Sequence, residues 1–278
     1  MNGVILINKP KDWTSRDVIN KLNKLLNTKK IGHTGTLDPI ATGILVVLIG
    51  KYTKCTELLS SLTKEYIAEI KLGIKTDTLD ITGNVLEEKT CHISKEDIIN
   101  EFKSLKGTFK QKIPMYAAKK IDGKKLYDYA RSGIEIPRPE NEVEIYNIEL
   151  LDFNNDIVTF KTTVSKGTYI RSLIEKICDD LNILGTMSNL IRTKQGDFTI
   201  EDSFSLDDIE KGNYRLLKVH DLFDYPTVEL NKDKYKLAKN GNKISLDRNE
   251  DYLILNYQNE EVAIYKRKDD YYQPEIMF

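Results

Sequence analysis

GHTGTLDPIATGILVVLI (residues 32–49) joins a glycine-rich loop to an aliphatic run, and the interpretation of the whole chain starts from this stretch. The run at residues 44–49 predicts a buried strand. In the loop before it, Pro39 biases Asp38 away from helical geometry and toward an extended backbone. Gly43 permits backbone angles that are closed to other residues. The stretch therefore predicts a stiff, open loop that presents one carboxylate directly before a core strand.

Asp-Pro beside glycine and threonine is also ordinary turn chemistry, so the loop alone does not assign a role to Asp38. Several familiar sites are excluded. The chain has no Gly-x-Gly-x-x-Gly fingerprint, no Gly-Lys-Ser/Thr phosphate loop and no Gly-x-Ser-x-Gly elbow. An Asp-x-Asp-x-Thr phosphoryl acceptor fails because position 40 is isoleucine. The scattered histidines, His33, His92 and His220, argue against a metal centre, and His33 alone reads as a hydrogen-bonded loop residue.

The composition is that of a globular protein, with 278 residues, 40% hydrophobic and 31% charged. This length suggests a main domain with a smaller one attached. The aliphatic runs are too short to cross a bilayer, and the N-terminus lacks a signal-peptide pattern. The three cysteines are far apart in sequence, which argues against disulfides and metal knuckles. We therefore expect a cytoplasmic protein without a metal or cofactor.

Positive charge is concentrated locally although the net charge is only −1. Residues 1–60 hold nine basic and four acidic residues, and residues 103–125 hold eight lysines with a single aspartate. Surfaces of this kind attract phosphate backbones. A solvated lysine-rich face is the alternative interpretation of each run.

Helical and strand patterns alternate along the chain without a regular βαβ array. Helices are predicted at 14–26, 51–62, 94–107 and 167–181, and strands at 3–10, 44–49, 65–74, 143–153 and 157–164. Tyr66 falls on the inward face of its strand, and Asn155 lies in a hairpin turn. A boundary near Tyr225-Pro226 separates a small β-rich module. The fold class is α+β, with a mixed, largely antiparallel sheet flanked by helices.

Six stretches resemble, in order, the motifs of the bacterial tRNA pseudouridine-55 synthases, the stand-alone members of the pseudouridine synthase family. They are INKPKDWTS, GHTGTLDPIATG, KEYIAEIKLGIKTDTLDITG, IPMYAAKKIDGKKLYDYARSGIEIPRP, VSKGTYIRSL and SNLIRTKQGDF. Together they extend over about residues 3–205. The resemblance implies a catalytic domain at residues 1–225 with an RNA-clasping insertion at 107–138. It also implies a short PUA-like module at 226–278.

The resemblance implies that Asp38 is the catalytic nucleophile and that Arg171 is its cationic partner. Pseudouridine formation breaks the bond from ribose C1′ to uracil N1, turns the base and rejoins it through C5. Attack at ribose C1′, attack at uracil C6 and charge stabilisation on the sugar all remain open. Each route needs an ionised carboxylate, and burial disfavours that charge unless a cation lies beside it. A guanidinium holds a carboxylate in fixed geometry better than an ammonium group does.

The remaining site residues are also implied by the resemblance. Tyr66 is catalytic and stacks on the flipped uracil, while Tyr169 and Leu190 form walls of the uridine pocket. His33 occupies the space that the flipped nucleotide leaves. Lys9 packs and positions the loop and is not a catalyst. Base flipping costs a few kcal/mol, which contacts in the pocket recover.

The resulting hypothesis is an isomerase that converts uridine 55 in the T-loop of tRNA. It uses no cofactor and no metal, and it does not associate with a membrane. Its partner is the T-arm of tRNA, and it needs no obligatory protein partner. Two alternatives stay open. One is a non-catalytic tRNA-binding or folding module that uses the same pocket. The other is a guide-RNA-dependent pseudouridine synthase subunit, although GHTGTLDP is more similar to the stand-alone enzymes.

Overall fold

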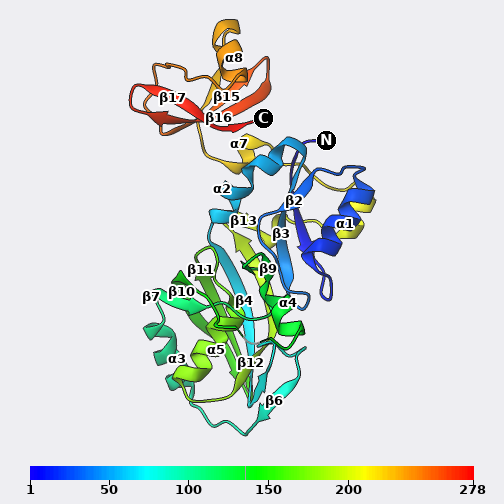
Figure 1. Ribbon diagram of the computed structural model, residues 1–278, viewed down its shortest axis with the longest axis vertical. Coiled ribbons are helices and arrows are strands. Elements are labelled where there is room, and N and C mark those ends of the chain that lie inside the picture. The colour runs from blue at the N-terminus through cyan, green and yellow to red at the C-terminus, as the bar shows by residue number, and fades with distance from the viewer. Residues whose placement is uncertain (135) are drawn as a thin grey trace.

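The loop–strand stretch contributes the second strand from one edge of a large twisted sheet in the computed structural model, which describes residues 1–134 and 136–278 (Figure 1). In spatial order the sheet contains β1 (Gly3–Lys9), β3 (Thr42–Ile49), β12 (Gly185–Gln195), β4 (Lys64–Leu72), β11 (Ile157–Val164), β10 (Glu140–Asn154) and β7 (Gly107–Lys112). Two short strands extend it, β2 (Ile31–His33) on β3 and β13 (Phe198–Thr199) on β12. β3 and β12 run parallel, while the other pairs along this path are antiparallel. The predicted mixed, largely antiparallel sheet is confirmed.

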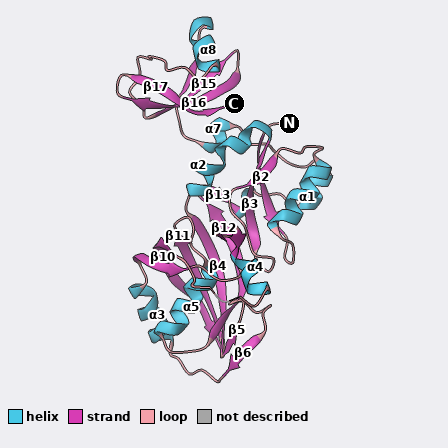
Figure 2. Cartoon of the chain, in the orientation of Figure 1, coloured by secondary structure: helices cyan, strands magenta, loops and turns pink. Residues whose placement is uncertain are grey.

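The helices are α1 (Ser15–Leu25), α2 (Thr56–Ser61), α3 (Lys95–Ser104), α4 (Leu126–Arg131), α5 (Ile170–Asp180), α6 (Leu206–Glu210), α7 (Val219–Leu222) and α8 (Lys232–Lys239), with 3-10 turns η1 (Gly50–Cys55) and η2 (Ile200–Asp202). α1, α3 and α5 lie against the large sheet, whereas α8 lies with the C-terminal strands (Figure 2). α3 and α5 pack on one face of the sheet, on β10 and β12 respectively. Their apolar side chains bury the main core, which includes Phe102, Phe160 and Ile177. α1 covers a second cluster beside β1 and β3.

Capping explains why two of the helices begin where they do. Thr14 and Ser94 each accept a hydrogen bond from the backbone amide of an aspartate three residues later, and that aspartate binds back to the capping amide. Both starts are confirmed. The predicted helix at 51–62 is wrong in its first half, because η1 adopts 3-10 geometry before α2 begins.

The predicted insertion at 107–138 begins within the sheet. Its first residues form β7, which pairs with β10 at the sheet edge, so the segment outside the sheet starts at Ile113. That segment contains the small hairpin β8 (Lys120–Ile121) and β9 (Lys124–Lys125), followed by α4. Position 135 lies outside the described residues. A second small hairpin, β5 (Ile74–Thr76) and β6 (Val85–Glu88), follows β4.

The C-terminal residues form a separate sheet at one end of the molecule (Figure 1). Its strands are β14 (Thr227–Glu229), β15 (Tyr252–Tyr257), β16 (Glu260–Lys268) and β17 (Tyr271–Met277). The sheet docks on η1 through a partly buried network. The Glu261 carboxylate accepts a hydrogen bond from the Tyr52 hydroxyl and another, at 3.1 Å, from the Val219 amide. Burial raises the pKa of Tyr52, so the phenol stays protonated and remains a donor.

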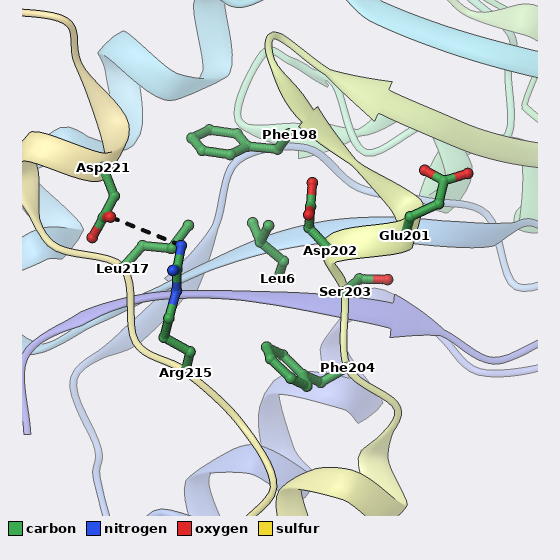
Figure 3. A pocket seen from close by; sticks show the side chains of 9 residues that line it. All are labelled: Leu6, Phe198, Glu201, Asp202, Ser203, Phe204, Arg215, Leu217 and Asp221. Atoms are coloured by element: carbon green, nitrogen blue, oxygen red, sulfur yellow. Dashed lines mark ion pairs between the residues drawn. The ribbon is translucent and has the colours of Figure 1, made fainter.

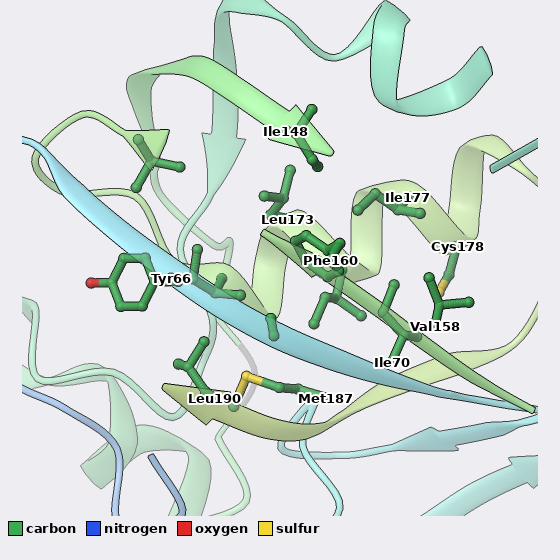
Figure 4. Close-up of a cluster of buried hydrophobic side chains, with 14 of the residues drawn as sticks. Tyr66, Ile70, Ile148, Val158, Phe160, Leu173, Ile177, Cys178, Met187 and Leu190 are labelled. Atoms are coloured by element: carbon green, nitrogen blue, oxygen red, sulfur yellow. The ribbon is translucent and has the colours of Figure 1, made fainter. Parts of the chain in front are cut away.

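The main core extends up to the Asp38 loop. Leu37, Ile40 and Ala41 of the loop belong to the same buried cluster as the α5 side chains. Figure 4 shows Tyr66 at the margin of this cluster, with its ring hydroxyl pointing away from the aliphatic side chains. The loop is therefore held by apolar burial on one side and leaves its polar groups on the other.

Candidate active site

An ion pair joins the Asp38 loop to the start of α5. Arg171 Nε donates to Asp38 Oδ2 and Nη2 donates to Oδ1, both at 2.9 Å, so the pairing is bidentate. The Arg171 side chain is 4% exposed, whereas that of Asp38 is 29% exposed. The cation is thus buried and oriented, and the carboxylate remains accessible to a substrate. The structure brings the predicted pair together in the fork geometry that favours guanidinium over ammonium.

Arg171 has two further partners, and they come from different segments. Nη1 donates to the carbonyl of Thr78 at 3.1 Å, in the turn that joins β5 and β6. Nη2 also donates to the carbonyl of Tyr116 at 2.9 Å, in the insertion. Four hydrogen bonds therefore fix the guanidinium, and the insertion is tied directly to the Asp38–Arg171 ion pair.

Two residues near the N-terminus hold the loop on either side of Asp38. The Ser15 hydroxyl accepts from the Leu37 amide at 2.9 Å. Lys9 is fully buried, and its ammonium group donates to the carbonyls of Pro10, Trp13 and Pro39. Burial lowers the pKa of Lys9 to about 8, and Asp38 opposes this shift. The backbone contacts of Lys9 are those of a loop-positioning residue.

Arg192 and Gln195 of β12 hold the loop from beneath, and neither was predicted from the sequence. Arg192 is 1% exposed and bonds the carbonyls of Gly35 and Ile44. Gln195 is fully buried and donates to the Thr34 hydroxyl at 2.6 Å. The only sequence signal was the alternation of β12, which places Arg192 on the same face as Leu190.

Tyr66 and Leu190 lie on neighbouring strands. Tyr66 is directly opposite Arg192 in the β4–β12 ladder, and Leu190 is opposite Ala68. Tyr66 is 8% exposed and Leu190 5% exposed, and both belong to the cluster that contains Leu37. The structure therefore gathers these two predicted pocket residues on the sheet face beside the loop.

Tyr169 immediately precedes α5 and is held through its backbone. The Gln111 side chain accepts from the Tyr169 amide and donates to its carbonyl. Burial raises the pKa of Tyr169; Arg171 opposes the rise and Asp38 adds to it. The phenol thus lies within electrostatic range of both members of the ion pair. Its ring packs against the apolar cluster of the insertion.

His33 is the predicted site residue with the weakest link to the ion pair. It ends β2, opposite Val47 of β3, and is partly buried. Burial lowers the pKa of His33, and Arg192 and Arg16 contribute to the shift, so the imidazole is neutral at pH 7. Among the described residues, buried Nδ1 has no hydrogen-bond partner. The ring is therefore a neutral, polar-edged surface at the start of the loop.

In residues 1–134 and 136–278, no group of three or more His, Cys, Asp or Glu side chains is placed to hold a metal ion. Nor is any helix there long and apolar enough to cross a membrane.

A cavity of about 480 Å³ opens elsewhere, between β1, η2 and residues 215–221 (Figure 3). Its charged lining includes Glu201, Asp202 and an Arg215–Asp221 contact of 3.8 Å. None of the predicted site residues lines it. The candidate active site is therefore the Asp38–Arg171 centre and not this cavity.

Comparison with known proteins identifies the family of the chain. The family described as TruB family pseudouridylate synthase (N terminal domain) matches residues 23–170, which is more than half of the chain. The chain belongs to the TruB family. Asp38 lies within the matched region, and Arg171 follows it directly.

Relatives in the TruB family resemble the chain over most of its length. It is 47% identical over 255 residues to the tRNA pseudouridine synthase B of Fusobacterium nucleatum, with 90% of this chain and 89% of the relative covered. The Lactobacillus acidophilus protein of the same name is 38% identical and covers 100% of this chain and 98% of the relative. A solved structure titled "Structure of H/ACA RNP bound to a substrate RNA containing 2'-deoxyuridine" has the same fold, with a TM-score of 0.72 and 23% identity. The match covers 99% of this chain and 84% of that one.

Proposed function

We propose that this chain is a tRNA pseudouridine synthase that isomerises uridine 55 in the T-loop, acting in the cytoplasm without a guide RNA. The observation that carries the proposal is the bidentate Asp38–Arg171 pair, in which a buried guanidinium orients a carboxylate that remains partly exposed. Binding alone does not need an accessible carboxylate oriented in this way. The names of the TruB relatives support the reaction and the tRNA substrate.

Asp38 acts as the nucleophile on a uridine that has left its stack. Attack at ribose C1′ releases uracil from the sugar, and attack at C6 forms an adduct with the base. In both routes the C1′–N1 bond breaks, a C1′–C5 bond forms, C5 loses its proton and N1 gains one, and the carboxylate is released unchanged. Arg171 fixes the direction from which the carboxylate approaches the substrate. Tyr66 stacks on the flipped base, and Tyr169 and Leu190 line the pocket around it.

The insertion supports RNA binding at the same site. Lys119 and Lys120 are exposed, and Tyr127 and Tyr129 lie beside the amines or guanidinium of neighbouring basic residues. Lysines next to aromatic rings suit an RNA backbone with unstacked bases. The insertion also supplies the Tyr116 carbonyl to Arg171, so an RNA clasped there lies against the ion pair.

The deciding experiment incubates the purified chain with an unmodified T-arm hairpin and measures pseudouridine in the product. We expect product from the wild type and none from Asp38→Asn, which should still bind the hairpin. Product from Asp38→Asn would refute the nucleophile. Binding and remodelling without product from either protein would favour a tRNA-folding module. Product only after addition of a guide RNA would favour the guide-dependent alternative.

A further inference from the structure

Arg192 holds both ends of the stretch that carries Asp38. From β12, its Nε donates to the carbonyl of Ile44 at 2.7 Å and Nη2 donates to the carbonyl of Gly35 at 3.2 Å. Two residues separate Gly35 from Asp38 on one side, and Ile44 begins the aliphatic run on the other. A single rigid side chain therefore spans the base of the loop.

The same residue lies beside the stacking tyrosine. Arg192 is the direct ladder partner of Tyr66, and both residues are buried on one face of the sheet. Side chains directly opposite each other in antiparallel strands have Cβ atoms about 5 Å apart. The guanidinium thus runs from the strand next to Tyr66 to the underside of the Asp38 loop.

Backbone contact at Gly43 leaves the loop little freedom. A Cβ atom at Gly43 would lie 2.2 Å from the Arg192 carbonyl oxygen, and Gly43 has φ of +100°. At Gly43 the loop is therefore pressed against the backbone of β12, and at Gly35 the Arg192 side chain binds it.

Burying the charged Arg192 side chain beneath the Asp38 loop is energetically unfavourable. Its side chain is among the largest that are fully buried, and within the described part of the chain it forms no salt bridge with a carboxylate. Burying an unpaired charge is unfavourable, and apolar packing often stabilises a core at least as well. The positive charge also contributes to the lowered pKa values of Lys9, Lys64 and His33. A role in positioning the Asp38 loop would explain why a buried charge is present here.

We propose that Arg192 is a positioning residue that sets the distance between the Asp38 carboxylate and the Tyr66 ring, and hence the width of the slot for the flipped uracil. This inference rests on the proposed function. A shift of the order of 1 Å in a reacting group costs about 100-fold in rate. Removing the hydrogen bonds of Arg192 should accordingly slow the chemical step more than it weakens RNA binding.

The test compares Arg192→Met, which keeps an unbranched chain without hydrogen bonds, with Arg192→Lys and with Lys194→Met. Lys194 is an exposed residue of the same strand and serves as the matched control. Single-turnover rate and hairpin affinity are measured for each, well below its melting temperature. We expect Arg192→Met to lose about 100-fold in rate with affinity within about 3-fold. Arg192→Lys should recover part of the rate, and Lys194→Met should match the wild type.

A purely structural role would lower the melting temperature and leave the rate of the folded fraction unchanged. That result, or a loss confined to affinity, would overturn the inference. If Arg192→Met does not fold, Arg192→Lys decides: a wild-type rate refutes the inference, and a reduced rate with unchanged affinity supports it. An inactive wild type would instead refute the proposed function, so the two failures are distinguishable.

Discussion

The Asp38 loop and the insertion meet at Arg171 but are built in opposite ways. Backbone and side-chain polar groups along the loop form hydrogen bonds with buried side chains from β1, α1, α5 and β12. The insertion has a small apolar cluster around Leu126 and a clamp at its base. There, Arg138 bonds the Ile113 carbonyl and pairs with Glu175 of α5. The Ile113 amide also donates to the Pro139 carbonyl.

This difference separates two physical requirements. The proposed nucleophile must be held near its productive geometry before the substrate arrives, and many hydrogen bonds hold the loop. The proposed RNA clasp must close and release, and the insertion is fixed at its ends while its middle lies on the surface. Variants of the two regions should consequently affect different kinetic parameters.

The largest effect is expected from Arg171→Lys in the rigid region. One ammonium group cannot reproduce the two bonds to Asp38 together with those to Thr78 and Tyr116. We expect a loss of about 100- to 1,000-fold in single-turnover rate with a smaller change in affinity. Lys176→Arg, on the exposed side of α5, is the control. Retention of more than a tenth of the wild-type rate would contradict the role of the fork.

Removing charge from the insertion should weaken binding instead. Lys119→Ala combined with Lys120→Ala removes two exposed cations. We expect about 10-fold weaker hairpin binding and a shallower salt dependence, by about 0.7–0.9 in slope for each phosphate that a lysine no longer neutralises. Titrations at several salt concentrations measure both. The control pair, Lys95→Ala with Lys103→Ala on α3, should leave the slope unchanged, and an equal effect of the two pairs would exclude a specific clasp.

A moderate effect is expected at the base of the insertion. Glu175→Gln keeps the shape of the side chain but removes the charge that Arg138 pairs with at 2.7 Å. Because the clamp is only partly buried, we expect about a 5-fold rise in KM with kcat within about 2-fold. Steady-state kinetics on the hairpin measure both, with Glu96→Gln on α3 as control. A fall in kcat alone would mean that the clamp acts on the ion pair.

The last predicted effect concerns the pH dependence of stability and not RNA binding or rate. The folded state loses the Lys9 proton near pH 8, whereas the unfolded chain keeps it to about 10.5. Between these values the unfolded state binds more protons, so stability from this group rises with pH. The difference in unfolding free energy, wild type minus Lys9→Met, should increase by about 2–3 kcal/mol from pH 8 to 10.5. Denaturant titrations measure it, with exposed Lys11→Met as control, and a flat or falling difference would contradict the shift.

Much of the fold could be predicted because local signals agreed with the final structure. The capping box at Thr14, the alternation around Tyr66 and the turn at Asn155 each depend on neighbouring residues. Residue-level reasoning alone left Asp38 as an ordinary turn residue. Its pairing with Arg171 was predicted from the ordered motifs of the family.

Features created by tertiary packing were not predicted. Nothing in the sequence around Arg192 marks it as buried, because its burial comes from the Asp38 loop that packs over its face of the sheet. The strand β7 was not predicted because its lysine-rich sequence has little apolar alternation. Its partner β10 also starts 28 residues after the end of β7.

The partners of Arg171 also set the order in which the site is completed during synthesis. The ribosome makes Asp38 early, and its guanidinium partner follows 133 residues later. A nascent chain that stops before α5 holds the loop sequence without its counter-charge. The ion pair therefore forms only after nearly two-thirds of the polypeptide has emerged, which keeps incomplete chains from presenting a finished site to RNA.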